Sequence, residues 1–131
     1  MADTAPNSAA SALALAATLA EHKGGDVVVL DVAAQAGWTD YFVIATATSS
    51  THLHGLARSL DETSARLGLQ RLRRGSLADD DEWLLMDLGT IVVHVMTEAA
   101  RSFYELEKLW FLSPATKVAA PEPRPVAPGD S

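Results

Sequence analysis

The stretch from Trp83 to Trp110 constrains the fold most strongly, because it reads as two strands that turn at a glycine and lead directly into a helix. The turn falls at Gly89, since glycine can adopt the positive φ that a tight hairpin requires. Thr97 is a suitable N-cap for the helix that follows. The apolar residues along one face of that helix are Phe103, Leu106 and Trp110. The stretch therefore predicts an antiparallel strand pair followed by an amphipathic helix.

Two continuous apolar runs rich in β-branched residues precede this stretch, at residues 26–33 and 41–47. Continuous rather than alternating runs are typical of strands that are buried on both faces. Residues 34–40, between the two runs, are expected to form a loop. The alternation of arginine and leucine within residues 70–75 indicates an edge strand with one solvated face.

Two further helices are predicted upstream of the hairpin. The first is capped by Ser8 or Ser11 and is stopped by the glycine pair at positions 24–25. The second is capped within residues 49–51 and ends at Gly68, with leucines at near-helical spacing between them. The residues of the first helix that share one face are expected to be Leu13, Ala16, Ala17 and Ala20.

The resulting order is helix, strand, strand, helix, strand, strand, strand, helix. This order predicts an α/β fold with a mixed five-stranded sheet flanked by helices on both faces. The crossover from the second to the third strand through the second helix is expected to be parallel and right-handed. The hairpin makes the last two strands antiparallel.

Length and proline distribution predict the domain organisation. The 131 residues suffice for one domain around a single hydrophobic core. Five of the six prolines lie at or beyond Pro114 and the sixth is Pro6, so we expect a domain at residues 8–113 after a flexible N-terminus at 1–7. The Pro- and Ala-rich tail at 114–131 is expected to be disordered, because its composition cannot bury enough apolar surface to offset the ordering entropy.

Composition excludes several classes of function. The chain has no cysteine, which removes disulfides, thiolate metal sites and thiol nucleophiles. Its net charge is −7, from 10 basic and 17 acidic residues, so broad binding to nucleic acid is not expected and a basic partner is favoured. No stretch is long and apolar enough for a membrane helix, and no targeting segment is recognisable. A soluble cytoplasmic protein is the simplest expectation.

Catalytic constellations are absent from the pattern. Metal-dependent nucleotidyl transfer requires two carboxylates that converge on one strand face, whereas the strand aspartates Asp31 and Asp87 are isolated in the sequence. The acidic run at 79–82 is better explained as a solvated loop than as a cation site. Residues 49–51 stand at a helix N-terminus that could hold an anion, and capping explains them equally well. For His94, a hydrogen-bonded imidazole in a mostly apolar strand is favoured over a catalytic base.

A recognition surface remains as the main functional candidate. Alternation along the first hairpin strand places Trp83, Leu85 and Asp87 on one face and Leu84 and Met86 on the other. If the first face is exposed, Trp83 offers an apolar anchor beside a carboxylate, which suits a basic protein partner. If it is covered, Trp83 packs beneath a helix. The pattern leaves these two interpretations open.

Three ordered motifs, TDYFVIATATSS, EWLLMDLGTIVVHVM and RSFYELEKLW, together resemble the ribosomal silencing factor family, also called Iojap-related proteins. The resemblance covers roughly residues 10–112. It implies an α/β fold related in architecture to nucleotidyltransferases but without their catalytic residues, no cofactor and no enzymatic activity. It also implies binding to large ribosomal subunit protein uL14, a steric block of subunit joining, and repression of translation when nutrients are scarce.

The resemblance implies a partner-binding surface that is formed by the first hairpin strand and by the motif before the second strand. Its residues are Trp83, Leu84, Leu85, Met86, Asp87, Thr39, Asp40, Tyr41 and His94. The chain departs from the family pattern at Ala47, where glycine is usual, and at Thr90, where aspartate is frequent. Two other functions stay open, namely a nucleotide-handling enzyme and a homodimerisation module.

Overall fold

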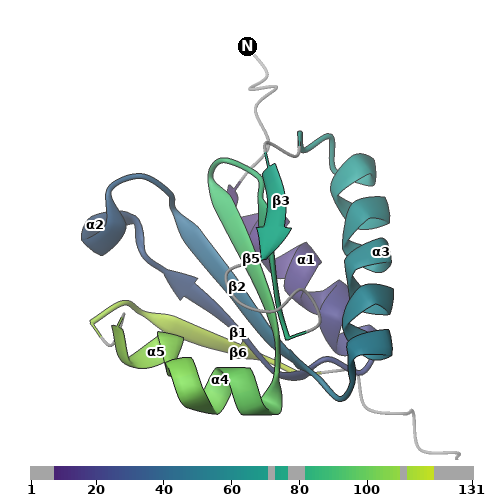
Figure 1. Cartoon of the computed structure of the whole chain (residues 1–131). Coiled ribbons are helices and arrows are strands. Elements are labelled where there is room, and N and C mark those ends of the chain that lie inside the picture. The colour runs from purple at the N-terminus through teal and green to yellow at the C-terminus, as the bar shows by residue number, and fades with distance from the viewer. Residues whose placement is uncertain (1–7, 71–72, 77–81, 110–111, 120–131) are drawn as a thin grey trace, which may run out of the picture.

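The computed structural model describes residues 8–70, 73–76, 82–109 and 112–119 (Figure 1). Along the chain these residues form α1 (Ser8–Glu21), β1 (Gly25–Asp31), α2 (Ala33–Ala36), β2 (Tyr41–Ala47), α3 (Ser50–Arg66), β3 (Arg73–Ser76), β4 (Trp83–Asp87), β5 (Ile91–Thr97), α4 (Glu98–Tyr104), α5 (Leu106–Leu109) and β6 (Ala115–Val118). The acidic run at 79–81 and Trp110 lie outside the described residues.

The strands form one mixed sheet in the order β3-β4-β5-β2-β1-β6. The only parallel pairing among the described strands joins β2 to β5, with Ile44 opposite His94, and the other neighbours are antiparallel. Two antiparallel pairings and one parallel pairing separate β3 from β2, so these two strands run in the same direction. The mixed sheet, the antiparallel hairpin and the parallel crossover through α3 are therefore confirmed.

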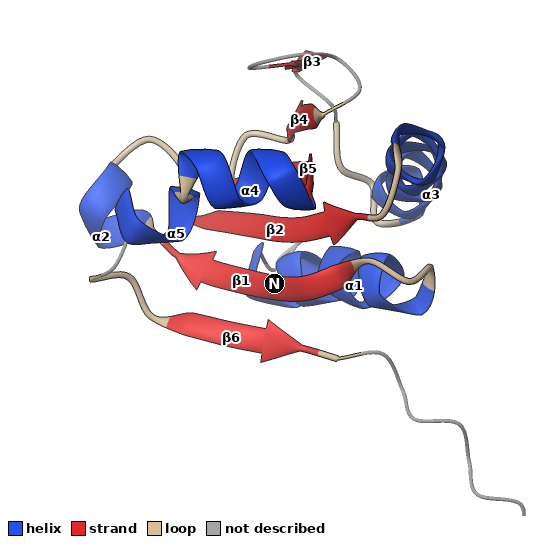
Figure 2. Ribbon diagram, turned by 60° about the horizontal axis from the view of Figure 1, so that its bottom comes forward, coloured by secondary structure: helices blue, strands red, loops and turns tan. Residues whose placement is uncertain are grey.

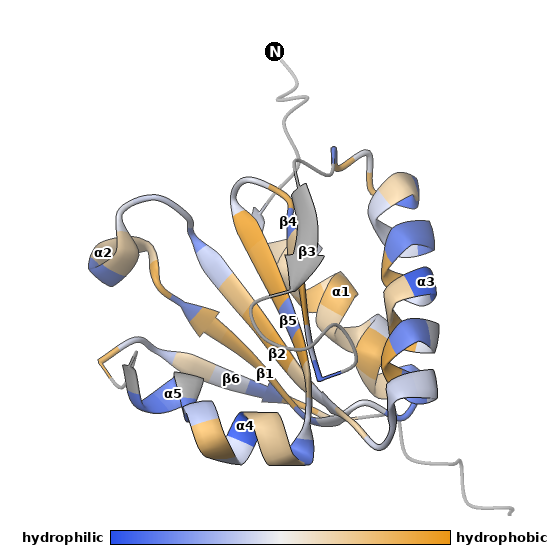
Figure 3. Ribbon diagram, in the orientation of Figure 1, coloured by the Kyte–Doolittle hydropathy of each residue, from blue (hydrophilic) through white to orange (hydrophobic). Residues whose placement is uncertain are grey.

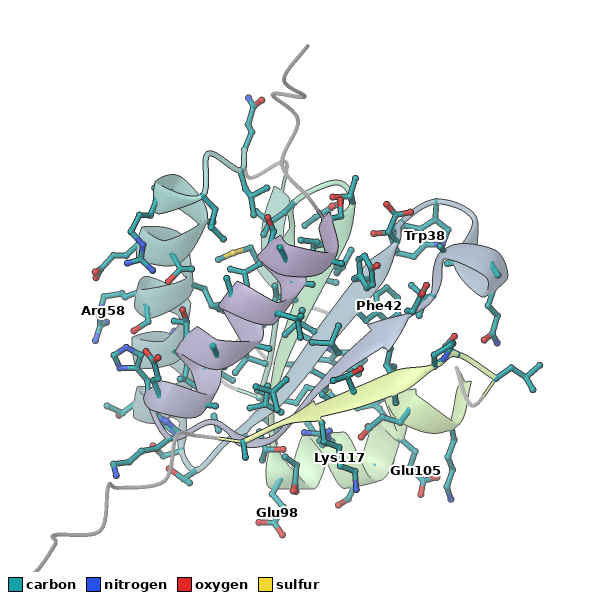
Figure 4. All side chains as sticks on the ribbon, turned by 180° about the vertical axis from the view of Figure 1, so that it is seen from behind. Trp38, Phe42, Arg58, Glu98, Glu105 and Lys117 are labelled. Atoms are coloured by element: carbon teal, nitrogen blue, oxygen red, sulfur yellow. The ribbon has the colours of Figure 1, made fainter. Side chains whose placement is uncertain are left out.

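Helices cover the two faces of the sheet unequally. Residues of α1 and α3 build the larger hydrophobic cluster on one face, which Figure 4 shows from the side of these helices. The smaller cluster on the opposite face includes Ala100 of α4, and Figure 2 shows α4 and α5 beside the strands there. Residues 27–30 of β1 and 42–45 of β2 are buried throughout, as their continuous apolar runs indicate. Figure 3 shows the same hydrophobic character along β1, β2 and β5.

Local capping follows the predicted chemistry. The Ser49 side chain accepts a hydrogen bond from the backbone N of His52 at 3.0 Å, at the start of α3. Thr97 accepts one from the backbone N of Ala100 at 3.3 Å, at the start of α4. Each cap satisfies one of the backbone donors that a helix N-terminus leaves free.

The segment after residue 113 differs from the expectation of a wholly disordered tail. Residues 115–118 form β6, a sixth strand that pairs with β1 from Val27 to Leu30. The carbonyl of Pro114 also accepts a hydrogen bond from the backbone N of Asp31 at 2.8 Å. Edge pairing uses backbone groups, and for this reason side-chain composition failed to indicate it. The predicted tail residues 120–131 and the N-terminal residues 1–7 lie outside the described part of the chain.

Two other local expectations were wrong. Residues 34–36, assigned to a loop, and Ala33, assigned to the end of the preceding strand, form the short helix α2, which ends at Gly37 with a φ of 79°. In α1, Leu13 is 46% exposed, whereas Leu15 and Leu19 are fully buried. The packing face of α1 is rotated from the predicted one, because two adjacent elements, β2 and α3, both contact this helix. Among the described residues, no helix combines the length and the hydropathy that crossing a bilayer requires.

Candidate docking surface

The structure brings the α2–β2 loop and the β4–β5 turn together at one end of the sheet. Thr39 is buried, and its hydroxyl donates to the carbonyl of Gly89 at 3.0 Å. The backbone N atoms of Asp40 and Tyr41 both donate to the carbonyl of Thr90, each at 3.0 Å. Residues 39–41, predicted from the resemblance alone, are thus adjacent to the hairpin that carries the rest of the predicted surface.

The β4–β5 turn is stabilised by its own side chain and by its glycine. The Asp87 carboxylate accepts a hydrogen bond from the backbone N of Gly89 at 2.9 Å. Gly89 has a φ of 89°, which residues with a Cβ adopt at a cost. The backbone N of Leu88 donates to the carbonyl of Ile91 at 2.8 Å and closes the turn. Asp87 therefore has a structural role besides any contact that it makes with a partner.

Alternation along β4 separates the predicted site residues as expected. Leu84 and Met86 belong to the larger core cluster beneath α1 and α3, and Met86 is fully buried. Leu85 is half-buried and packs against the smaller cluster on the opposite face. Consequently Met86 has no surface available for a partner and Leu84 has very little, whereas Leu85 and Asp87 retain some.

Trp83 is buried, which resolves its two open interpretations in favour of packing. Only 6% of its surface is exposed. Its indole Nε1 donates a hydrogen bond to Nδ1 of His94 at 3.1 Å, and its ring lies 4.7 Å from that of Tyr104. The exposed anchor that alternation allowed is therefore absent, because the C-terminal turn of α4 covers the indole.

His94 is 4% exposed and hydrogen-bonded through one ring nitrogen only. Burial lowers its pKa from 6.5 to about 4, because desolvation disfavours the imidazolium. A general base at neutral pH works best with a pKa near 7, so His94 is poorly suited to that role. Its Nε2 atom is buried and has no hydrogen-bond partner among the described residues. The favoured expectation of a hydrogen-bonded imidazole is thus met at Nδ1 but not at Nε2.

Aromatic rings extend from this pair to the surface on the same side of the sheet. Trp38 lies 5.9 Å from Phe42, and Phe42 lies 4.9 Å from His94. Figure 4 shows Trp38 and Phe42 next to each other at the α2–β2 end of the sheet. At the other end, the rings of Tyr104 and Phe103 are 4.9 Å apart. We call this set the aromatic face; it consists of Trp38, Phe42, Trp83, His94, Phe103 and Tyr104.

The outer members of the aromatic face are exposed to solvent. Trp38 is 62% exposed, Phe103 is 79% exposed and Tyr104 is 41% exposed. Sequence reasoning missed Trp38 and Tyr104, and it placed Phe103 on the same helical face as Leu106, where an inward orientation was the natural expectation. The break between α4 and α5 explains the difference, since Glu105 adopts a left-handed conformation with a φ of 47° and ends the helical periodicity after Tyr104. Large exposed aromatic residues are typical of protein contact surfaces.

The residues that could take part in nucleotide chemistry, at the N-terminus of α3 and on the strands, have structural roles or lie far apart. The backbone N of Thr48 donates to Nδ1 of His52 at 2.9 Å, and Ser49 caps α3, so the side chains at this helix N-terminus satisfy nearby donors. Asp31 and Asp87 lie on β1 and β4, which β2 and β5 separate. Three strand spacings correspond to about 14 Å, far beyond the roughly 4 Å between ions of a two-metal centre. The described residues include no group of three or more potential metal ligands.

Two hollows border Arg101, and neither is lined by a residue of the aromatic face. Their volumes are about 620 and 570 Å³, and both are bordered by Asp26, Arg101 and Glu107. The Arg101 guanidinium donates to Glu107 at 2.6 Å and to the Thr46 hydroxyl at 2.9 Å. Its hydrogen-bonding capacity is thus largely used within the protein, where it ties α4 and α5 to the end of β2.

Comparison with known proteins decides the family. The model of the family described as ribosomal silencing factor during starvation matches residues 5–129. The chain belongs to this family. Family membership confirms the resemblance read from the three motifs.

Several known proteins are similar to the chain over most of its length. A ribosomal silencing factor of Treponema pallidum is 42% identical over 105 residues, which cover 79% of this chain and 91% of that protein. The mouse protein named mitochondrial assembly of ribosomal large subunit protein 1 is 36% identical over 100 residues, which are 75% of this chain and 44% of the mouse protein. A crystal structure of a Chromobacterium violaceum protein superposes with a TM-score of 0.73 at 26% identity and covers 88% of each chain.

Proposed function

We propose that this protein silences ribosomes by docking on the large subunit through uL14 and by blocking the small subunit sterically, so that translation falls when nutrients are scarce. Family membership supports the ribosome as the target. The name of the mouse relative, which refers to assembly of the ribosomal large subunit, favours the large subunit. The partner uL14 and the steric block are what the sequence resemblance implies. The proposed mechanism includes no chemical reaction.

The exposed aromatic face is the observation that carries the docking proposal. Three of its rings are exposed. The half-buried Asp40 lies between Trp38 and Phe42 in the chain, and the half-buried Asp87 shares one face of β4 with Trp83. Aromatic residues at the centre and charges at the rim are typical of interfaces. The net charge of −7 favours a basic partner. We therefore propose that the partner contacts the aromatic face together with Leu85, Asp87 and Asp40. Tyr41 packs against the larger cluster on the opposite face of the sheet and is not part of this surface.

Because Trp83 is buried, the proposal is better tested with variants of exposed residues than with a Trp83 variant. Replacing Trp83 by alanine would remove a buried ring and destabilise the fold, so loss of binding would not distinguish docking from packing. The exposed rings avoid this difficulty. Trp38→Ala and Phe103→Ala truncate side chains that are 62% and 79% exposed.

The experiment measures co-sedimentation with purified large ribosomal subunits and the joining of small subunits in the same mixture. We expect the Trp38→Ala, Phe103→Ala double variant to weaken binding by about tenfold or more and to restore subunit joining, as loss of aromatic contacts commonly does. Leu13→Ala is the matched control, because Leu13 is a large exposed apolar residue on α1, on the opposite face of the sheet. Wild-type protein that fails to co-sediment, or a double variant that binds as tightly as wild type, would contradict the proposal.

Self-association and nucleotide binding are distinguishable in the same preparation. Sedimentation velocity at several protein concentrations detects a homodimer that uses the aromatic face, since the double variant would then be monomeric. Calorimetry with nucleotides and magnesium tests the enzymatic alternative, which no contact in the described residues favours.

A further inference from the structure

The hydrogen bond between Trp83 and His94 determines the tautomer of the histidine. An indole N–H is a donor only, so Nδ1 of His94 must accept, and the neutral ring then carries its proton on Nε2. The ring is neutral at physiological pH, since burial lowers its pKa to about 4. His94 therefore presents a single N–H donor, in a fixed orientation, on the sheet face that carries the exposed aromatic rings.

That donor lacks an acceptor within the described structure. The Nε2 atom is buried, and no described group lies within hydrogen-bonding distance of it. Buried donors in native proteins are almost always paired with protein groups or ordered water, because an unpaired donor has lost its hydration without compensation. The rings that contact His94 belong to Trp83 and Phe42, and neither ring contains an oxygen.

The residues that adjoin this pair from outside are exposed. Tyr104, which contacts Trp83, is 41% exposed, and Trp38, which contacts Phe42, is 62% exposed. Exposed side chains change rotamer on fast timescales, so either ring can move without disturbing the sheet. Tyr104 is also the last residue of α4, just before the left-handed Glu105. A partner that displaces Tyr104 or Trp38 therefore uncovers Trp83 or Phe42, the two rings that contact His94.

We propose that the docked protein partner supplies a carbonyl or carboxylate oxygen to Nε2–H of His94, so that this histidine selects for an acceptor at the centre of the aromatic contact. This inference rests on the proposed docking function and adds the chemistry of the partner group. A partner that placed a lysine, an arginine or another donor at this position would leave two donors facing each other. His94 thereby acts as a specificity residue, and Trp83 positions it.

The test compares two substitutions at position 94 in binding to purified large ribosomal subunits. His94→Gln keeps an amide N–H donor close to the position of Nε2, whereas His94→Phe keeps a ring and removes the donor. We expect His94→Phe to weaken binding by about tenfold, the usual scale for a lost buried hydrogen bond, and His94→Gln to stay within about threefold of wild type. Leu13→Ala is the control and should bind like wild type, because Leu13 is an exposed residue of α1 on the opposite face of the sheet.

Two further measurements separate recognition from folding. Thermal unfolding checks that the variants are folded. Both His94→Phe and His94→Gln remove the Nδ1 acceptor of the Trp83 indole, so we expect a similar loss of stability in both, whereas only His94→Phe should bind less tightly. Nitrogen-15 NMR of the histidine ring in the full chain reports which nitrogen carries the proton, and we expect Nε2 to carry it between pH 6 and pH 8.

Equal binding by wild type and His94→Phe would overturn the inference and leave the docking function intact, because the orphaned donor would then be satisfied by a buried water only. A proton on Nδ1 would overturn it as well. If wild-type protein does not bind large subunits at all, the proposed function fails and the inference fails with it.

Discussion

The indole N–H of Trp83 donates a hydrogen bond to Nδ1 of His94 and so connects two residues that are eleven positions apart in the sequence. Each residue was a candidate for function in its own right, Trp83 as an exposed anchor and His94 as a base. The hydrogen bond makes Trp83 the residue that orients His94, and burial keeps the His94 ring neutral. At this scale the contact partner of a side chain decides its function, and the side-chain type alone does not.

A pH dependence of stability follows from His94. Its pKa is 6.5 in the reference state and about 4 in the folded protein, so the unfolded chain binds the additional proton between these values. This contribution to stability is fully present above pH 6.5 and is lost as the pH falls toward 4. We expect the free energy of unfolding in urea to decrease from pH 7 to pH 4.5 by up to roughly 3 kcal/mol more in wild type than in His94→Gln.

The comparison concerns the slope with pH, so any uniform destabilisation of His94→Gln does not affect it. His22→Gln removes an exposed histidine and is expected to follow the wild-type curve. Parallel curves for wild type and His94→Gln would contradict the assignment of a buried neutral imidazole.

The sequence predicted well the helices and strands that depend on neighbouring residues. It did not predict the features that depend on contacts between residues far apart in the chain. The hairpin, α3 and the two buried strands β1 and β2 follow from adjacent residues, such as the cap at Ser49 and the turn at Gly89. The strand β6 and the packing face of α1 depend on segments far away in the chain. The pairing of β6 with β1 relies on backbone hydrogen bonds. The side chains of alanine, threonine and lysine in β6 do not indicate such a pairing.

The strand β6 can be tested by truncation. A chain that ends after Pro114 lacks β6 and exposes the backbone of β1, whereas a chain that ends after Ala119 keeps every residue of the strand. We expect the shorter chain to lose hydrogen-exchange protection at the amides of β1 that face β6, and to unfold at a lower urea concentration. The longer chain is the control and should match the full-length protein. Unchanged protection of β1 in the shorter chain would show that β6 contributes nothing to the sheet.

At the scale of the whole molecule, two differently built faces lie on one sheet. The side under α1 and α3 is a continuous apolar core, while the side under α4 leaves aromatic residues at the surface. Acidic residues outnumber basic ones along the chain, which gives the net charge of −7. An aromatic contact surface on an acidic protein is the combination expected for docking on a basic ribosomal protein.

Electrostatic attraction of this kind depends on ionic strength. We expect binding to large ribosomal subunits to weaken as salt is raised from about 50 to 300 mM, because ions screen exposed charges beyond roughly 10 Å at 0.1 M. Asp40→Asn should bind less tightly at low salt and show a shallower salt dependence, since Asp40 adjoins the proposed contact surface. Glu62→Gln, on an exposed position of α3, is the control and should keep the wild-type slope. Equal slopes for all three proteins would place the charged contact elsewhere.

The sequence by itself determined the α/β class, the buried strands, the hairpin and the family, because these rest on periodicity, turn chemistry and motifs that neighbouring residues carry together. Only the tertiary structure decided that Trp83 is buried, that Nε2 of His94 lacks a partner within the described part of the chain and that Trp38, Phe103 and Tyr104 reach the surface. Each of these outcomes depends on contacts between residues far apart in the chain. Alternation assigns a side chain to one face of a sheet, but what covers that face is settled by how α4 packs and where it ends.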